Sequence, residues 1–246
     1  MKLLNLRPVA NTLHRMNNDY EMRVPHIFQM VGLLGIMAIL ASIVWMRISP
    51  TNYGIVGIVV GMVLLLPTIL TLFVTRFAND RRFRVRDGIV HHAELKGHEQ
   101  VLDIGVGSGI TLFGLAKQLT TGKGIGIDIY DPNAGGGTPD IFWKNAQKEG
   151  IKDRVELKNM DARSMTFANS SFDVIVSTFA FHHIGNAEAR RKAAQEIVRV
   201  LKPGGKVFVY DGGFALSELE QVMRDSGMQV HRHGEQFAMV MGEKSA

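Results

Sequence analysis

Residues 101–109 read Val-Leu-Asp-Ile-Gly-Val-Gly-Ser-Gly, so a short apolar strand runs directly into a glycine-rich turn. An acid, Asp103, stands two places before the first glycine, Gly105. Glycine lets the backbone turn sharply and lets a ligand approach the main chain closely. The turn opens a helix predicted over residues 110–119, and the N-terminus of a helix favours anionic groups. The stretch therefore predicts a loop that holds a nucleoside-type cofactor.

The spacing of the glycines indicates which cofactor suits the loop. The dinucleotide fingerprint has the pattern G-x-G-x-x-G. Here the third glycine, Gly109, comes one residue early, and Asp103 precedes the turn. The stretch resembles motif I of class I S-adenosylmethionine methyltransferases more than it resembles an NAD site.

From about residue 84 the sequence alternates between strand and helix patterns, which predicts an α/β sheet. Helices are predicted at residues 85–95, 110–119, 142–150, 187–201 and 217–226. Ser217 is the expected N-cap of the last helix, and Glu220 completes its capping box. Strands are predicted at residues 100–104, 124–129, 154–158, 172–177, 206–210, 228–232 and 237–242.

This layout resembles the whole class I methyltransferase fold, from about residue 84 to the end. The resemblance implies a Rossmann-like seven-stranded sheet flanked by helices, with S-adenosylmethionine as the cofactor. Asp128 matches the acid that holds both ribose hydroxyls, and a carboxylate is able to accept two hydrogen bonds from a diol. Asp161 matches the acid that accepts from the adenine amino group. Alternatively, Asp128 is a solvated strand-end acid and Asp161 a turn residue. The residues that the resemblance assigns to the cofactor are Asp103, Gly105, Val106, Gly107, Ser108, Gly109, Asp128, Ile129, Asp161, Ala162 and Thr178.

Two further segments extend the resemblance. Residues 172–184 match the fourth motif and residues 201–205 match the turn before the fifth strand. The ending His182-His183-Ile184 resembles the branch that contains ubiquinone and menaquinone methyltransferases. The signature of adenine and glutamine N-methyltransferases, N-P-P-[FYW], is missing, which argues against DNA or protein-glutamine substrates.

The two histidines are the candidate catalytic residues. Histidine titrates near neutrality and is able to take a proton from a phenol or thiol acceptor. His182 is the first choice, and either histidine alternatively shapes the pocket or holds a backbone group. The loop over residues 130–140 is long for this family. It is a lid, part of the acceptor pocket, or a flexible connection, with Tyr130 placed to pack on the adenine edge.

The N-terminal part of the chain predicts a membrane hairpin. Residues 27–46 and 54–75 carry no charge, and each run is about 20 residues long, enough to cross a bilayer. Two buried core helices or a cleaved signal peptide are the alternatives. Basic residues flank the hairpin on both sides and only Arg47 lies in its loop, which places both termini in the cytoplasm. Gly57 and Gly61 form a small-residue face that either packs the two spans or dimerises the protein.

Five arginines follow the second span, at residues 76–86. A basic segment at this position binds anionic lipid headgroups, or it serves only as a topology signal; nucleic acid is not an expected partner. The chain has no cysteine, which excludes disulfides, thiolate metal sites and a cysteine nucleophile. Among its nine histidines, His91, His92 and His98 form no supported ligand pattern, so no metal site is expected.

The sequence thus predicts four segments. These are a cytoplasmic N-terminal segment (1–26), two transmembrane helices (27–75), a basic juxtamembrane linker with the helix leading into the domain (76–99), and a cofactor-binding domain (100–246). The predicted function is a membrane-anchored methyltransferase acting on a small lipophilic acceptor: a quinone-like phenol, a lipid, or a hydrophobic thiol or amine. A homo-oligomer through the spans is possible. The alternatives are a membrane-anchored NAD-dependent oxidoreductase and a non-catalytic scaffold that binds S-adenosylmethionine.

Overall fold

The computed structural model describes residues 25–49, 52–131 and 137–245. The chain forms two compact units, one from Arg84 onward and one over residues 21–83. The expected basic residues Lys2, Arg7, Arg15 and Arg23 lie outside the described residues, as do positions 132–136 of the long loop.

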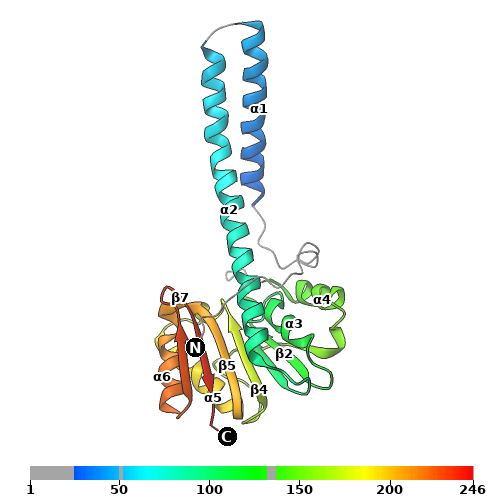
Figure 1. Ribbon diagram of the computed structural model, residues 1–246, viewed down its shortest axis with the longest axis vertical. Helices are drawn as coiled ribbons and strands as arrows, with labels where there is room; N and C mark the ends of the chain where they lie inside the picture. The colour runs from blue at the N-terminus through cyan, green and yellow to red at the C-terminus, as the bar shows by residue number, and fades with distance from the viewer. Residues whose placement is uncertain (1–24, 50–51, 132–136, 246) are drawn as a thin grey trace. The chain divides into compact units, whose positions relative to one another are not determined.

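The unit from Arg84 onward is built on one seven-stranded sheet, with the order β3-β2-β1-β4-β5-β7-β6 (Figure 1). The first five strands in the chain run parallel, whereas β7 pairs antiparallel with both β5 and β6. A dinucleotide-binding sheet of the doubly wound type has the order 3-2-1-4-5-6, so the inserted antiparallel strand distinguishes this sheet from it. The strands are β1 (Gln100–Ile104), β2 (Lys123–Asp128), β3 (Val155–Asn159), β4 (Phe172–Thr178), β5 (Leu201–Gly212), β6 (Gln229–His233) and β7 (Phe237–Glu243).

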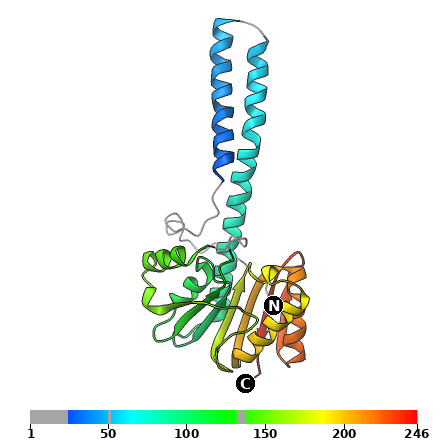
Figure 2. The same ribbon diagram turned by 180° about the vertical axis from the view of Figure 1, so that it is seen from behind.

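Helices cover both faces of this sheet. Helices α5 (Ala187–Val200) and α6 (Ser217–Asp225) lie side by side on one face (Figure 2). On the other face, α3 (Ile110–Ala116) packs against the last turns of α2 (Tyr53–Ala93), where Gly114 leaves room for the side chains of Arg86 and Val90. Helix α4 (Pro139–Lys148) follows β2, and Thr138 caps it by accepting from the Ile141 amide at 3.3 Å.

The central strands are mostly apolar because helices bury them from both sides. The side chains of Leu102, Ile175 and Val207 are fully buried in adjacent strands. They belong to one core together with the inner faces of α5 and α6. This packed core holds the carboxyl ends of β1, β2 and β4 in a fixed register.

Two local expectations were wrong. Helix α6 begins at Ser217, but its N-cap is Leu216 and no side chain caps it. The carboxylate of Glu220 binds Arg232 on β6 instead of closing a capping box. Strand β5 begins at Leu201 rather than Lys206, because Leu201 already pairs with Phe172 before a register shift.

The unit over residues 21–83 is a helical hairpin of α1 (His26–Ile48) and the first part of α2. Small residues line its interface. A Cβ added at Gly61 would lie 2.7 Å from the Gly35 carbonyl, and one at Gly35 would lie 2.8 Å from the Gly61 carbonyl. Thr68 Oγ1 donates to the Phe28 carbonyl at 2.6 Å. The glycine face therefore packs the two helices of one hairpin against each other.

Helix α2 runs from Tyr53 to Ala93 without interruption. The expected second span and the helix at residues 85–95 are thus parts of one helix, and residues 76–84 do not form a separate linker. The reason is compositional, since residues 68–87 contain neither glycine nor proline. Both α1 and α2 are long and apolar enough to cross a membrane, and only 17% and 6% of their apolar windows are buried. Such exposure is unlike that of a core helix.

Candidate cofactor and active site

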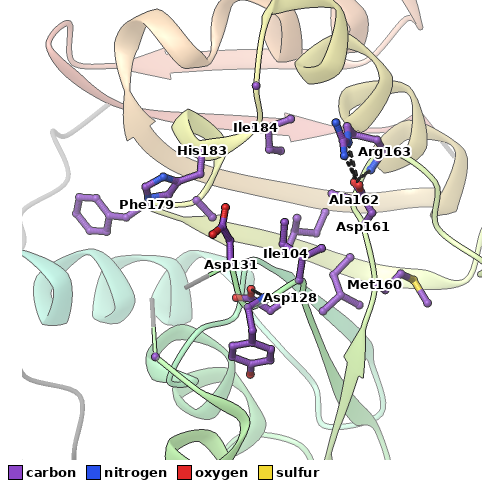
Figure 3. Close-up of a pocket in the computed structure, with 17 residues that line it drawn as sticks. Ile104, Asp128, Asp131, Met160, Asp161, Ala162, Arg163, Phe179, His183 and Ile184 are labelled. Carbon is purple, nitrogen blue, oxygen red and sulfur yellow. Dashed lines mark hydrogen bonds and ion pairs between the residues drawn. The ribbon is translucent and has the colours of Figure 1, made fainter. Parts of the chain in front are cut away.

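A cavity of about 290 Å³ opens at the carboxyl ends of β1, β2, β3 and β4 (Figure 3). Ligands of open α/β sheets bind in this crevice, and the volume is near the lower limit of about 300 Å³ for small-molecule sites. Of the predicted site residues, those that line the cavity are Gly105, Asp128, Ile129, Asp161, Ala162 and His183. Sequence reasoning missed lining residues that include Ile104, Ile127, Met160, Arg163, Phe179 and Ile184.

The glycine turn forms one wall of the cavity. Gly105 has φ +70°, and its amide donates to the Ile127 carbonyl at 2.9 Å, which ties the turn to β2. A Cβ at this position would collide with the side chain of Ala180, which also lines the cavity. Only glycine therefore leaves this wall open to a ligand.

Asp128 ends β2 at the rim of the cavity, with its carboxylate held by two backbone amides. Oδ2 accepts from Gly107 N at 2.9 Å, and Oδ1 accepts from Tyr130 N at 2.7 Å. A carboxylate oxygen has room for more than one hydrogen bond. The two amides fix the orientation of the group and leave acceptor capacity for the hydroxyls of a ribose.

Asp103 lies on β1, is 1% exposed, and does not line the cavity. Its Oδ2 accepts from Leu112 N at 3.1 Å, whereas Oδ1 is buried and has no hydrogen-bond partner among the described residues. Burial, and then the charge of Asp128, raises the pKa of Asp103 well above its usual range. Asp103 therefore holds the first part of α3 without lining the cavity.

Asp161 lines the cavity as expected, but a neighbour already binds it. Arg163 donates two hydrogen bonds to Oδ2 of Asp161, from Nε at 2.9 Å and from Nη2 at 2.5 Å. The guanidinium lowers the pKa of Asp161. An adenine amino group at Asp161 must therefore share the carboxylate with Arg163. The Asp-Ala-Arg sequence at residues 161–163 was the available signal for this pair.

The two histidines differ in whether they line the cavity. Both lie on a short 3₁₀ helix, η3 (Phe181–His183), after β4. His183 lines the cavity, whereas His182, the first choice, does not. His182 Nδ1 instead lies 2.7 Å from Oδ1 of Asp211 on β5. The ring centroids of His182 and His183 are 3.9 Å apart, so His182 packs against a residue that lines the cavity.

Phe179 is a lining residue with an unusual backbone. Its φ is +54°, a conformation that a bulky residue rarely adopts. Its amide donates to the Tyr210 carbonyl at 2.9 Å, and its ring contacts those of Tyr210 and Phe237 at centroid distances of 5.2 and 6.2 Å. An aromatic surface thus continues from the cavity wall onto β5 and β7. Phe179, Tyr210 and Phe237 are far apart in the sequence, so no local pattern predicted this aromatic surface.

The remaining predicted cofactor residues support the site without lining it: Val106, Gly107, Ser108, Gly109 and Thr178. Ser108 O accepts from Asn145 Nδ2 at 3.2 Å, which links the turn to α4. Thr178 Oγ1 lies 2.9 Å from Thr111 Oγ1. Over the part of the chain that the structure describes, no group of side chains is placed to bind a metal ion.

Tyr130 begins the long loop and lines the cavity with φ +49°. Its hydroxyl donates to the Gly107 carbonyl at 3.2 Å. Burial, and then the nearby carboxylate of Asp128, raises the pKa of this phenol, so the group remains a neutral donor at physiological pH. Tyr130 therefore joins the loop to the glycine turn.

Comparison with known proteins extends this description. Residues 102–209 match a family described as a methyltransferase domain. A demethylmenaquinone methyltransferase from Lactobacillus johnsonii is 31% identical over 119 residues, which are 48% of this chain and 46% of that protein. The sterol 4-C-methyltransferase strm-1 from Caenorhabditis elegans is 34% identical over 123 residues, which are 50% of this chain and 34% of that protein. The chain thus spans less than half the length of these relatives.

A crystal structure of a SAM-dependent methyltransferase from Aquifex aeolicus has the same fold. It aligns with a TM-score of 0.52 at 22% identity, over 64% of this chain and 88% of that one. The strand order and this likeness define the fold as the class I methyltransferase type. That neighbour is named as dependent on S-adenosylmethionine (SAM). The open wall at Gly105 and the Asp128 carboxylate at the rim fit such a cofactor.

Proposed function

We propose that the chain is a membrane-anchored methyltransferase that transfers the methyl group of S-adenosylmethionine to a small lipophilic acceptor. The observation that carries the proposal is the cavity at the carboxyl ends of β1 to β4, with a glycine wall and the Asp128 carboxylate at its rim. When bound, S-adenosylmethionine supplies a methyl group on a positively charged sulfur.

The chain's own residues bind and orient the two reactants. Asp128 would accept from the ribose hydroxyls, Asp161 and Met160 would border the adenine, and the backbone at Gly105 would admit the rest of the cofactor. Methyl transfer is an in-line displacement, so alignment of acceptor, methyl and sulfur is the main task of the protein. The rim near Ile129, which is 54% exposed, and Phe179 offers apolar surface to the acceptor.

A lipophilic acceptor is favoured by the helical hairpin. Its side chains expose apolar surface along both helices, as a bilayer-embedded pair does. Two relatives are named for demethylmenaquinone and for a sterol, and both molecules are lipophilic. The anchor brings the domain to the surface where such acceptors reside.

The proposed topology has two spans, with both termini and the domain in the cytoplasm. Arginines at residues 76–86 follow the second apolar run, and one arginine, Arg47, lies at the other end of the hairpin. Basic residues are retained on the cytoplasmic side. Anionic headgroups attract positive charge at this position, and the arginines here are Arg76, Arg81, Arg82, Arg84 and Arg86, of which Arg86 also pairs with Asp87.

The cofactor is tested by calorimetry on the full chain in detergent micelles. Asp128→Asn removes an acceptor that the diol needs, and we expect at least about a tenfold loss of affinity for S-adenosylmethionine, since a hydrogen bond to a charged group contributes about 1.5–3 kcal/mol. The control Asp153→Asn, on the exposed turn before β3, retains wild-type affinity. Binding of NAD in place of S-adenosylmethionine would support the oxidoreductase alternative.

The reaction is tested with methyl-labelled S-adenosylmethionine and an extract of membrane lipids. We expect label in a lipid fraction together with S-adenosylhomocysteine. Label in a soluble molecule would contradict the lipophilic acceptor and leave the methyltransferase. Tight cofactor binding with no turnover on lipid or soluble extracts would indicate a scaffold.

A further inference from the structure

Asp211 and His182 form a pair beside the cavity. Asp211 lies near the carboxyl end of β5 and is 1% exposed. Its carboxylate accepts three hydrogen bonds: from His182 Nδ1 at 2.7 Å and Gly212 N at 2.6 Å on Oδ1, and from His182 N at 3.1 Å on Oδ2. The same carboxylate therefore holds both the backbone and the ring of His182.

The bond to the ring selects one tautomer. An ionised carboxylate only accepts hydrogen bonds, so Nδ1 of His182 carries the proton and Nε2 is the acceptor of the neutral ring. The His182 side chain is 34% exposed, against 2% for Asp211. Because the Nδ1 edge faces the buried carboxylate, the opposite edge with Nε2 is the one open to other molecules.

The pair adjoins a wall of the cavity, and an aromatic surface borders the same cavity at Phe179. The ring of His182 lies against His183, which lines the cavity. Tyr210 precedes Asp211 on β5, so the two side chains point to opposite faces of the sheet, and the ring of Tyr210 contacts Phe179 and Phe237. Phe237 is 39% exposed. Flat, apolar molecules pack well on such a surface.

A purely structural role would not need the ring. The backbone amide of His182 already anchors η3 to β5, yet the shorter of the two bonds to His182 goes to its imidazole. The arrangement matches the general logic of a base that a third group orients. The other charged groups facing this segment are already engaged: Arg190 of α5 donates to the Gly185 carbonyl and pairs with Glu218, and Arg232 of β6 donates to the Gly213 carbonyl and pairs with Glu220.

We propose that Asp211 is a positioning residue that holds His182 as the proton acceptor for a phenol- or enol-type hydroxyl on the methyl acceptor. The inference rests on the methyltransferase function proposed above and narrows its substrate class. A thiol with a pKa of about 8.5 ionises partly without help, whereas a phenol with a pKa of about 10 stays protonated at neutral pH and needs a base.

The chemistry balances without a further reactant. The acceptor's O–H proton moves to Nε2 of His182. The oxygen forms its bond to the methyl carbon as the bond from that carbon to sulfur breaks, and the sulfur keeps the electron pair. The positive charge lost at sulfur reappears on the imidazole, where the Asp211 carboxylate stabilises it, as in other oriented histidine bases.

The tautomer is tested without an acceptor, by NMR of the full chain with ¹⁵N-labelled histidine in detergent micelles. We expect the neutral ring of His182 to carry its proton on Nδ1. In Asp211→Asn the amide is able to donate to Nδ1, and we expect the proton to move to Nε2. A proton on Nε2 in the wild type would overturn the inference.

The proton transfer is tested with labelled S-adenosylmethionine and the membrane-lipid extract. His182→Gln and Asp211→Asn are each expected to lower turnover by about 10²- to 10⁴-fold, the usual range for general bases, with no additive loss in the double variant. Affinity for S-adenosylmethionine by calorimetry should stay at the wild-type value. The controls are His231→Gln on β6 and Asp225→Asn at the end of α6, both exposed.

The outcomes separate the two proposals. Loss of turnover with normal cofactor affinity and an altered tautomer supports the inference. Wild-type turnover in both variants overturns it while the methyltransferase proposal stands. Failure of the wild-type chain to bind S-adenosylmethionine contradicts the proposed function itself. A uniform rate loss in Asp211→Asn that is independent of pH, with the tautomer unchanged, would show a structural anchor and also overturn the inference.

Discussion

At the scale of single residues, backbone conformation and side-chain pairing decide what the site is able to bind. Gly105 and Gly150 both have positive φ, +70° and +67°. A Cβ at Gly105 collides with Ala180, whereas one at Gly150 meets nothing within 4 Å. The two positions therefore separate backbone strain from obstruction of the cavity.

We predict that Gly105→Ala lowers the affinity for S-adenosylmethionine at least tenfold, a change of about 1.4 kcal/mol. The reason is that the added methyl group collides with Ala180 in the cavity wall and narrows the cavity. Gly150→Ala introduces similar backbone strain, of about 1–2 kcal/mol. It should lower the melting temperature and leave the affinity for S-adenosylmethionine unchanged. Calorimetric titration and thermal unfolding measure the two effects. Equal affinity losses in both variants would show that strain alone is responsible.

A second prediction concerns the Asp161–Arg163 pair. Arg163 lowers the pKa of Asp161 in the folded chain, so the pair contributes stability above the unfolded pKa of about 3.9. That contribution is lost as the pH falls through the lower, folded pKa. In Arg163→Gln the pKa of Asp161 should rise towards its ordinary value, which ¹³C NMR of the carboxyl group measures. Because both side chains are more than a third exposed, high salt should reduce the difference. An unchanged pKa in the variant would contradict this account of the pair.

At the scale of elements, the hairpin depends on small residues between α1 and α2. A Cβ at Gly57 would lie 3.2 Å from the Ser42 Cβ, slightly closer than the usual 3.5–4.5 Å of a disulfide. The native chain has no cysteine, so an introduced pair reports on this contact alone. The same close packing occupies the face that Gly57 and Gly61 would otherwise offer to a second chain.

We expect the pair Ser42→Cys and Gly57→Cys to form an intramolecular crosslink on mild oxidation, seen as a shift on a non-reducing gel. The matched pair Ile43→Cys and Gly57→Cys should not, because Ile43 is 44% exposed and points away from α2. Crosslinked dimers from the first pair would show instead that the glycine face joins two chains.

At the scale of the whole molecule, the anchor predicts where each part of the chain meets solvent. A cysteine at position 52 lies in the hairpin loop, and one at position 245 lies near the end of the domain. In intact cells, a membrane-impermeant thiol reagent should label Asn52→Cys, whereas Ser245→Cys should require permeabilisation. The reason is the arginine bias at the ends of the hairpin. The reverse pattern would contradict the proposed topology.

The sequence determined the fold class and the position of the cofactor loop, because strand and helix periods and the glycine spacing are local. The strands predicted at residues 100–104 and 172–177 match β1 (Gln100–Ile104) and β4 (Phe172–Thr178) closely, since short buried strands have a strong apolar pattern. Gly105 and Asp128 followed from the same local logic, and both line the cavity.

The tertiary structure alone decided which side chains meet. Asp211 lies 29 positions from His182, and Phe237 reaches Phe179 from a strand that the chain adds last. Pairings of this kind depend on strand order and register, which no local pattern encodes. The course of α2 followed from the lack of glycine and proline over residues 68–87, and not from the change from apolar to basic composition.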